Sequence, residues 1–249
     1  MSRSRNARRK PNLRSTSGHV SVASPTTSIA NSHVLPWTYA RVILLGGLVI
    51  ASLAVMPLDI EISRFLGTEN LPGDAVSALK MTEFFAHGFG ITLILAAVFA
   101  LDPSRRYALI PVIVAQLLAS LVVHVVKVNV VRWRPADFFN LSEPATSSFV
   151  SWLGWLNPDS NQSWNLMSVT QSYPSGHSAA VVALALSLTW LYPHGRVLFL
   201  VMAILGCLQR IIFHAHWPSD VLMGATIGYL VAMSVLNSRF AQRMNSRQT

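Results

Sequence analysis

The fold class that the sequence predicts is all-α, an integral membrane bundle of about six transmembrane helices. Of the 249 residues, 52% are hydrophobic and only 12% are charged, and the mean hydropathy is +0.45. This composition is too apolar for an ordinary soluble domain of this length. Six apolar runs carry most of the hydrophobic residues: 36–56, 84–101, 107–131, 178–192, 197–213 and 221–236.

The six runs differ in length. The first three are long enough to span a bilayer unaided, whereas the last three lie near or below the usual threshold of about 18 residues. Taken singly, the last three fit buried core helices equally well. Because three clear spans precede them, we interpret them as the continuation of one helical bundle.

Both ends of the chain are basic. Residues 1–33 contain six Lys or Arg, no acid and many serines, which predicts a disordered tail. The same composition also fits an organelle transit peptide. We expect a basic cytoplasmic tail at 1–33, a transmembrane domain at 34–238 and a second basic cytoplasmic tail at 239–249.

The distribution of charge predicts the orientation of the bundle. If the N-terminus is cytoplasmic, the inner segments hold 13 of the 19 Lys and Arg but only one acid. The outer segments then hold the other six basic residues and nine acids. This is a strong positive-inside pattern, and it places a long loop at about 132–177 and the turn at 214–220 on the same, outer side.

The net charge of +9 could by itself suggest a nucleic-acid partner. The basic residues, however, gather at the ends of apolar runs, as topology signals do, so we expect no nucleic acid. Cys207 is the single cysteine and lies inside an apolar run. That excludes a disulfide framework and a cysteine metal site.

A first polar cluster ends the third apolar run. Lys127 and Arg134 are seven residues apart, about 700° of helix, so a continuous helix would project both from one face about 10 Å apart. Both could then reach one anion, although interfacial anchoring is an alternative. Pro135 would discourage the helix from continuing. Arg132, about 140° away from that face, is expected to contact lipid headgroups.

A second cluster, Pro174 to His177, opens the fourth run. Ser175 can cap the helix, and Gly176 lets a ligand approach the backbone closely. A helix N-terminus offers N–H groups and a positive dipole end to an anion. His177 could give or take a proton near neutral pH. Alone, this cluster fits an ordinary capped helix as well.

A third cluster, with Arg210, His216 and Asp220, lies between the last two runs. Pro218 is expected to begin the last helix, which leaves His216 in the turn and Asp220 in the first helical turn. An Asp there can accept from one imidazole nitrogen and leave the other as a nucleophile. The alternative is a capping Asp beside a structural His.

In chain order, these clusters resemble the three signature motifs of the type 2 phosphatidic acid phosphatase superfamily, K-x6-R-P, P-S-G-H and S-R-x5-H-x3-D. They read here as Lys127 through Pro135, Pro174 through His177, and Arg210 through Asp220. The sequence departs from the pattern at Gln209, where the family usually has Ser. The resemblance is to the membrane lipid phosphatase branch, and it extends to the layout of six runs.

The resemblance implies a metal-independent phosphatase that works through a phosphohistidine and needs no cofactor. On this basis His216 attacks phosphorus and Asp220 orients it. His177 protonates the leaving oxygen and then helps to activate water. The phosphoryl oxygens are expected to contact five residues: Lys127, Arg134, Arg210, and Ser175 and Gly176 through backbone N–H groups.

The expected substrate is a lipid phosphate, because the site falls at the outer membrane–water boundary. Aromatic residues in the 132–177 loop favour headgroup depth. The family suggests undecaprenyl diphosphate, phosphatidylglycerophosphate, phosphatidic acid and lipid A phosphate, and the sequence leaves both this choice and the oligomeric state open. A bacterial inner membrane, with the site on the periplasmic side, is the expected setting.

Three alternatives remain open, and the second and third belong to other functional classes. The first is a phosphatase of a soluble phosphate ester. The second is a transporter or channel that binds an anion without turnover, which would favour repeats or broken helices that are not visible here. The third is a soluble vanadate-dependent haloperoxidase, which shares the motifs but not the apolar runs.

Overall fold

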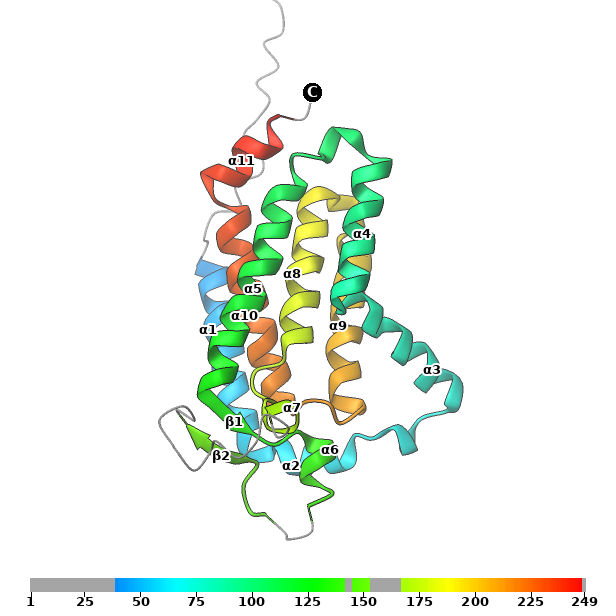
Figure 1. Cartoon of the computed structure of the whole chain (residues 1–249), viewed down its shortest axis with the longest axis vertical. Helices are drawn as coiled ribbons and strands as arrows, with labels where there is room; N and C mark the ends of the chain where they lie inside the picture. The colour runs from blue at the N-terminus through cyan, green and yellow to red at the C-terminus, as the bar shows by residue number, and fades with distance from the viewer. Residues whose placement is uncertain (1–38, 142–144, 153–166, 248–249) are drawn as a thin grey trace, which may run out of the picture. The chain divides into compact units, whose positions relative to one another are not determined.

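The computed structural model describes residues 39–141, 145–152 and 167–247, and the expected N-terminal tail lies outside them. Its longer helices pack side by side, and most of its short elements gather at one end of the bundle, with the short helix α11 (Arg239–Asn245) at the other end (Figure 1). The helices are α1 (Tyr39–Val55), α2 (Asp59–Phe65), α3 (Gly73–Met81), α4 (Gly88–Leu101), α5 (Leu109–Asn129), α6 (Pro135–Phe138), α7 (Met167–Thr170), α8 (Gly176–Leu191), α9 (Arg196–Ile212), α10 (Pro218–Leu236) and α11 (Arg239–Asn245). The strands are β1 (Val130–Arg132) and β2 (Phe149–Trp152), which pair antiparallel. Short 3-10 turns are Met56–Leu58, Thr68–Asn70, Thr82–Phe85, Pro103–Arg105 and Pro193–Gly195.

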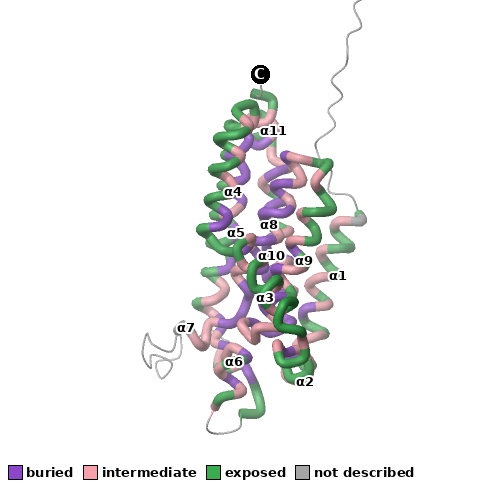
Figure 2. Tube along the Cα trace, turned by 90° about the vertical axis from the view of Figure 1, so that its right-hand side faces the viewer, coloured by how far each residue is buried: buried purple, intermediate pink, exposed green. Residues whose placement is uncertain are grey.

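Helix α8 forms the centre of the bundle. It packs against α5, α9 and α10, and its Leu184 and Leu188 also contact Ile91 of α4. It carries apolar or small residues on all sides, as a helix surrounded by other helices does. Figure 2 shows it as one of the most buried segments. Because α8 is enclosed by protein, its 16 residues, about 24 Å, need not match the bilayer thickness.

The contact between α8 and α10 depends on two glycines one helical turn apart. A Cβ at Gly224 would collide with the carbonyl oxygen of Ser175, and one at Gly228 would collide with that of Ala179. The two backbones can therefore approach as closely as they do only because these positions carry no side chain. This close packing fixes the start of α10 against the start of α8.

The outer surfaces of the peripheral helices are apolar. Large hydrophobic side chains are exposed along α1, α5 and α9, which is the pattern of a surface that faces lipid rather than water. Examples are Ile43, Ile50, Leu117, Leu121, Leu200 and Ile204. The burial colours in Figure 2 show this distribution, with exposed segments outside and buried ones within.

By length and composition, four helices in the described part of the chain can cross a membrane: Arg41–Phe65, Leu109–Asn129, Pro193–Ile212 and Pro218–Leu236. A fifth span exists if Gly73–Phe85 and Gly88–Leu101, which meet at a bend of 65°, are counted together. The expectation that run 84–101 spans unaided is therefore wrong, because the helix breaks before Gly88. The spans Pro193–Ile212 and Pro218–Leu236 are longer than the runs 197–213 and 221–236, since Pro193 and Pro218 begin helical turns ahead of the apolar residues.

The segment expected as the second basic tail contains helix α11. It packs against α5 and α10, and its Ala241 is fully buried. Ser238 caps it by accepting a hydrogen bond from the N–H of Ala241. The described part of this segment thus belongs to the bundle.

Candidate active site

The three polar clusters meet at one end of the bundle. The last turn of α5, the first turn of α8, the last turn of α9 and the first turn of α10 all lie there, beside β1, α6 and α7 (Figure 1). The antiparallel arrangement that the sequence predicts therefore brings together the residues of all three motifs. Their side chains arrive from elements up to 93 positions apart, between Lys127 and Asp220.

His216 and Asp220 form a buried pair, as predicted. Pro218 is the first residue of α10, and Asp220 accepts a hydrogen bond from the N–H of Trp217 in a capping box. Oδ2 of Asp220 lies 3.7 Å from Nδ1 of His216. Because one carboxylate oxygen faces Nδ1, Nε2 is the ring nitrogen that remains for a substrate.

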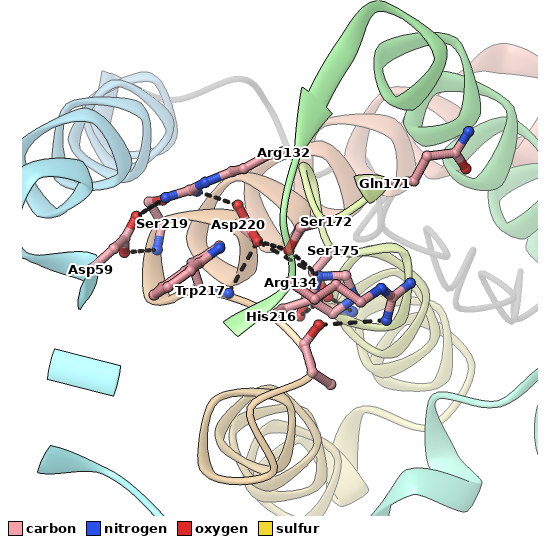
Figure 3. A network of polar contacts seen from close by, with 12 residues as sticks. Asp59, Arg132, Arg134, Gln171, Ser172, Ser175, His216, Trp217, Ser219 and Asp220 are labelled. Carbon is pink, nitrogen blue, oxygen red and sulfur yellow. Dashed lines mark hydrogen bonds and ion pairs between the residues drawn. The ribbon is translucent and has the colours of Figure 1, made fainter. Parts of the chain in front are cut away.

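Ser172 completes this pair and was not predicted. Its hydroxyl donates to Oδ2 of Asp220 at 2.5 Å and lies 3.5 Å from Nδ1 of His216 (Figure 3). It is fully buried, so its contacts with the two side chains are not shared with bulk water. Ser172 therefore helps to fix the carboxylate oxygen that faces the imidazole.

Burial sets the charge of the imidazole. Exclusion of water is the main cause that lowers the pKa of His216 to about 4; the nearby Lys127 and Arg134 act in the same direction, and Asp220 opposes them. His216 is 2% exposed. At neutral pH the ring is therefore uncharged and retains the lone pair that a nucleophile needs.

Ser175 is the N-cap of α8, as predicted. Its Oγ accepts from the N–H of Ser178 at 3.3 Å, and its own N–H donates to the carbonyl oxygen of Asp220 at 3.0 Å. The expectation that the Ser175 N–H binds phosphate is therefore wrong, because that donor already has a partner. The first-turn N–H groups that follow, at Gly176 and His177, are the ones that α8 can offer to an anion.

Lys127 and Arg134 approach the pair, but by a different route from the one expected. Helix α5 ends at Asn129, and the chain then continues as β1. Arg134 lies beyond the strand, and Pro135 starts α6 rather than ending α5. The expectation of a shared helical face is therefore wrong. Both cations nevertheless lie near enough to His216 to lower the pKa of its imidazole.

Contacts with loop carbonyls hold these two cations. Nζ of Lys127 donates to the carbonyl oxygen of Gln171 at 2.5 Å, and Nη1 of Arg134 contacts that of Ala215 at 3.4 Å. Burial lowers the pKa of Arg134, Arg210 lowers it further, and Asp137 opposes the shift. Arg134 still carries its charge at neutral pH, because the ordinary pKa of a guanidinium is above 12.

Arg132 does not contact headgroups, contrary to expectation. Its side chain is fully buried and forms ion pairs with Asp59 and Asp220, each at 2.5 Å (Figure 3). The expected direction assumed a helix through residue 132, but in β1 successive side chains alternate between two faces. Asp59, which lies in α2, was also not predicted.

Glu83 is a further residue that no motif indicated. It lies in the 3-10 turn before α4, and its Oε1 is 3.0 Å from Nη2 of Arg210 and 3.8 Å from Nε2 of His177. Gln209, where the family motif has Ser, accepts from Nε of Arg210 at 2.6 Å and donates to Glu83 at 3.4 Å. The side chain of Gln209 thus links Arg210 to Glu83.

An apolar groove leads away from His177. It has a volume of about 980 Å³ and lies between α4, α5 and α8. Its lining along α5 extends from Leu109 to Val123, about 20 Å. Residues at its polar end and along its apolar wall include His87, His177, Ile91, Leu95, Ile113 and Leu117.

Metal-binding side chains are not grouped in the described residues: no three of the His, Cys, Asp and Glu residues there are arranged to hold a metal ion. The charges that face His216 are instead two cations and one carboxylate, on Lys127, Arg134 and Asp220. Positively charged groups of this kind stabilise the negative charge of a phosphoryl group during its transfer.

Known proteins resemble this chain over the region that holds the three polar clusters. The sequence profile of the PAP2 superfamily matches residues 108–244, which is more than half of the chain and includes all three motifs. Lipid A 1-phosphatase of Rhizobium etli is 34% identical over 84 residues, 30% of this chain and 36% of that protein. Lipid A 1-phosphatase of Rhizobium johnstonii is 41% identical over 61 residues, 24% of this chain and 25% of that protein. The matches thus span about a third and a quarter of these relatives.

The crystal structure of Aquifex aeolicus LpxE has a similar fold. The TM-score is 0.55 at 22% sequence identity, and the similarity covers 73% of this chain and 96% of that one. At this identity the likeness concerns the fold alone. It confirms the predicted all-α fold, and the apolar helices that are long enough to cross a bilayer support the membrane location of the chain.

Proposed function

Since the chain belongs to the PAP2 superfamily, we propose that it is a membrane phosphatase that hydrolyses a lipid phosphate or diphosphate through a phosphohistidine. The observation that carries the proposal is the buried pair of His216 and Asp220. An uncharged imidazole, oriented at Nδ1 by a carboxylate, sits beside Lys127 and Arg134. This arrangement combines a nucleophile with stabilisation of transferring phosphoryl charge.

In the first step, Nε2 of His216 attacks phosphorus and the bond from phosphorus to the lipid oxygen breaks. His177 gives its proton to that oxygen, so the lipid leaves as a neutral alcohol, or as a monophosphate if the substrate is a diphosphate. Lys127, Arg134 and Arg210 hold the phosphoryl oxygens, together with the first-turn N–H groups of α8.

In the second step, His177 takes a proton from water, and the oxygen of that water attacks phosphorus. The phosphorus–nitrogen bond breaks, which regenerates His216 and releases inorganic phosphate. Asp220 stays ionised throughout and stabilises the positive imidazole ring that each step passes through. The protons balance, because His177 loses one in the first step and regains one in the second.

The apolar groove supports a lipid as the substrate. Its polar end includes His177, the proposed acid, and it continues along α4 and α5 among apolar side chains. A phosphate held near His216 would place an attached acyl chain at the mouth of this groove. A soluble phosphate ester would leave the groove unused, so the geometry favours a lipid over that alternative.

Among lipids, we favour a phosphate of lipid A, because two partial relatives are lipid A 1-phosphatases. Undecaprenyl diphosphate, phosphatidylglycerophosphate and phosphatidic acid are the competing substrates. The positive-inside charge pattern supports cytoplasmic termini and a site on the periplasmic side of a bacterial inner membrane. The proposed domain begins at 34, and because α11 packs against the bundle it extends past 238 to include Arg239–Asn245.

The decisive experiment is phosphate release from a panel of these four lipids and a soluble ester, with the full-length protein in detergent. His216→Ala should abolish release, and the matched control His194→Ala, an exposed residue between α8 and α9, should retain it. Equal release from wild type and His216→Ala would refute the assignment.

A second experiment tests for a metal. EDTA should leave activity intact, and a loss of activity that magnesium restores would refute the histidine mechanism.

A further inference from the structure

The two oxygens of the Asp220 carboxylate serve two different networks. Oδ2 faces His216 and accepts from Ser172, whereas Oδ1 accepts from Nη1 of Arg132 (Figure 3). Asp220 has no exposed surface, so these partners determine how its charge is distributed. A cation that pairs with Oδ1 draws negative charge toward that oxygen. The attraction between Oδ2 and the imidazole of His216 is then weaker.

Arg132 has partners on every side of its guanidinium group. Nε donates to Oγ of Ser148 at 3.1 Å, and Nη1 also donates to Oγ of Ser219 at 2.8 Å. Its carbon Cζ lies 4.2 Å from the ring centroid of Phe149 and 5.3 Å from that of Trp217. The side chain is therefore held in one position, and lysine could not reproduce the fork of donors.

Asp59 supplies the second carboxylate of this network. It is 1% exposed and receives Nη2 of Arg132 at 2.5 Å, the N–H of Ser219 at 2.9 Å and the hydroxyl of Ser219 at 2.5 Å. Seven residues earlier in the chain, in α1, Oγ of Ser52 donates to the carbonyl oxygen of Ser219 at 3.0 Å. The junction of α1 and α2 thus holds the residue directly before Asp220.

We propose that Asp59 and Arg132 are positioning residues that set how strongly Asp220 attracts the proton on Nδ1 of His216, and hence the reactivity of Nε2. The proposal rests on the phosphohistidine function described above. It assigns a role to a residue of α2, which lies before the matched region that begins at residue 108. Arg132 acts on Asp220 directly, and Asp59 acts on it through Arg132.

The opposite charges of the two residues predict opposite effects. Without Arg132, the Asp220 carboxylate keeps its full charge for His216, and the imidazole holds a proton more tightly. Without the Asp59 charge, Arg132 pairs with Asp220 alone, and the imidazole holds a proton less tightly. Every other group that faces His216 is unchanged in both variants: Asp220, Ser172, Lys127, Arg134 and His177.

The test compares Asp59→Asn and Arg132→Met in the full-length protein in detergent. In the dependence of kcat/KM on pH, the acid limb should move down by about one pH unit in Asp59→Asn and up by a similar amount in Arg132→Met. Arg132→Lys keeps the positive charge, so the acid limb of its pH profile should lie close to that of the wild type. Asp102→Asn, in the polar cluster with Arg105 and Tyr192 beyond α4, is the matched control and should not shift.

A purely structural clamp predicts a different result. It would lower the yield or the thermal stability of each variant without moving the acid limb, or move it in the same direction in both; either outcome overturns the proposal. Asn is isosteric with Asp, so Asp59→Asn keeps the test possible if Arg132→Met does not fold.

A second readout separates this proposal from the proposed function. Titration of ¹⁵N-histidine signals by NMR, with His216→Ala to assign the His216 resonance, needs no substrate. If the wild type releases no phosphate but the two variants shift the His216 titration in opposite directions, the function fails and the positioning role stands. If the wild type is active and the titration does not move, the positioning role fails alone.

Discussion

The guanidinium group of Arg210 lies 3.0 Å from the carboxylate of Glu83. A carboxylate that contacts a proposed phosphate-binding cation competes with phosphate for it, since both ligands are anions that accept from the same donors. Glu83 belongs to the 3-10 turn that precedes α4, next to the 65° bend between Gly73–Phe85 and Gly88–Leu101. A phosphate bound by Arg210, as proposed, would therefore displace or share this contact.

We expect Glu83→Gln to bind inorganic phosphate more tightly, with an inhibition constant about three to tenfold lower than that of wild type. The amide has the same shape but no charge, so Arg210 becomes available to the anion. Glu61→Gln, which removes an exposed carboxylate that pairs with Arg64, is the control and should not change inhibition. Weaker inhibition would instead mean that Glu83 holds Arg210 in place.

The proposed acid role of His177 predicts an effect that depends on the leaving group. His177→Ala should lower kcat about 10²–10⁴-fold for a lipid phosphate while KM changes little, because the alkoxide cannot leave without a proton. For p-nitrophenyl phosphate, whose leaving group needs no proton, the loss in kcat/KM, which reports the first step alone, should be much smaller, although water activation in the second step is slowed for both substrates. An equal loss of kcat/KM for both substrates, or a higher KM alone, would contradict the acid role.

The lowered pKa of His216 predicts the acid limit of activity. Because burial keeps the ring neutral down to about pH 4, activity that depends on its lone pair should persist below 6.5, the usual pKa of histidine, and fall as pH decreases through about 4. The ¹⁵N-histidine titration of His216 is the direct measurement, since the substrate phosphate also titrates. A His216 midpoint near 6.5 would show that the ring is hydrated.

Gly224→Ala should damage both the fold and the site. The added methyl group would press on the carbonyl oxygen of Ser175 and separate α8 from α10, at a cost of about 1–3 kcal/mol. Gly46→Ala in α1 is the matched control, because no atom lies within 4 Å of the position of its Cβ. It should be neutral or slightly stabilising. The thermal midpoint in detergent and the rate of phosphate release report the two effects, and an unchanged midpoint for Gly224→Ala would contradict the close contact.

The apolar runs predicted the bundle because a span is a local property of the sequence. The polar clusters likewise predicted the meeting of His216, Asp220 and Lys127, since antiparallel helices bring their ends together. The path between Lys127 and Arg134 was wrong because Val130 and Val131 continue the apolar run, although β-branched residues also favour an extended chain. Periodicity cannot separate the two conformations in so short a segment.

Three residues of the site were not predicted from the sequence, for a different reason. Asp59, Glu83 and Ser172 each stand alone in the sequence, without a partner at a helical or motif spacing. Asp59 acts on Asp220, 161 positions away, by way of Arg132. Glu83 contacts Arg210, 127 positions away, and Ser172 contacts Asp220, 48 positions away. Only the tertiary arrangement brings a single polar residue into such a network.

The groove that starts at His177 gives the proposed reaction two exits. A dephosphorylated lipid is more apolar than its precursor and can withdraw along α4 and α5 into the bilayer. Inorganic phosphate is strongly hydrated and leaves from the polar end of the bundle, beside β1 and α6. The products would then depart into different phases, so neither has to wait for the other, and the enzyme could work at a surface crowded with its own lipid product.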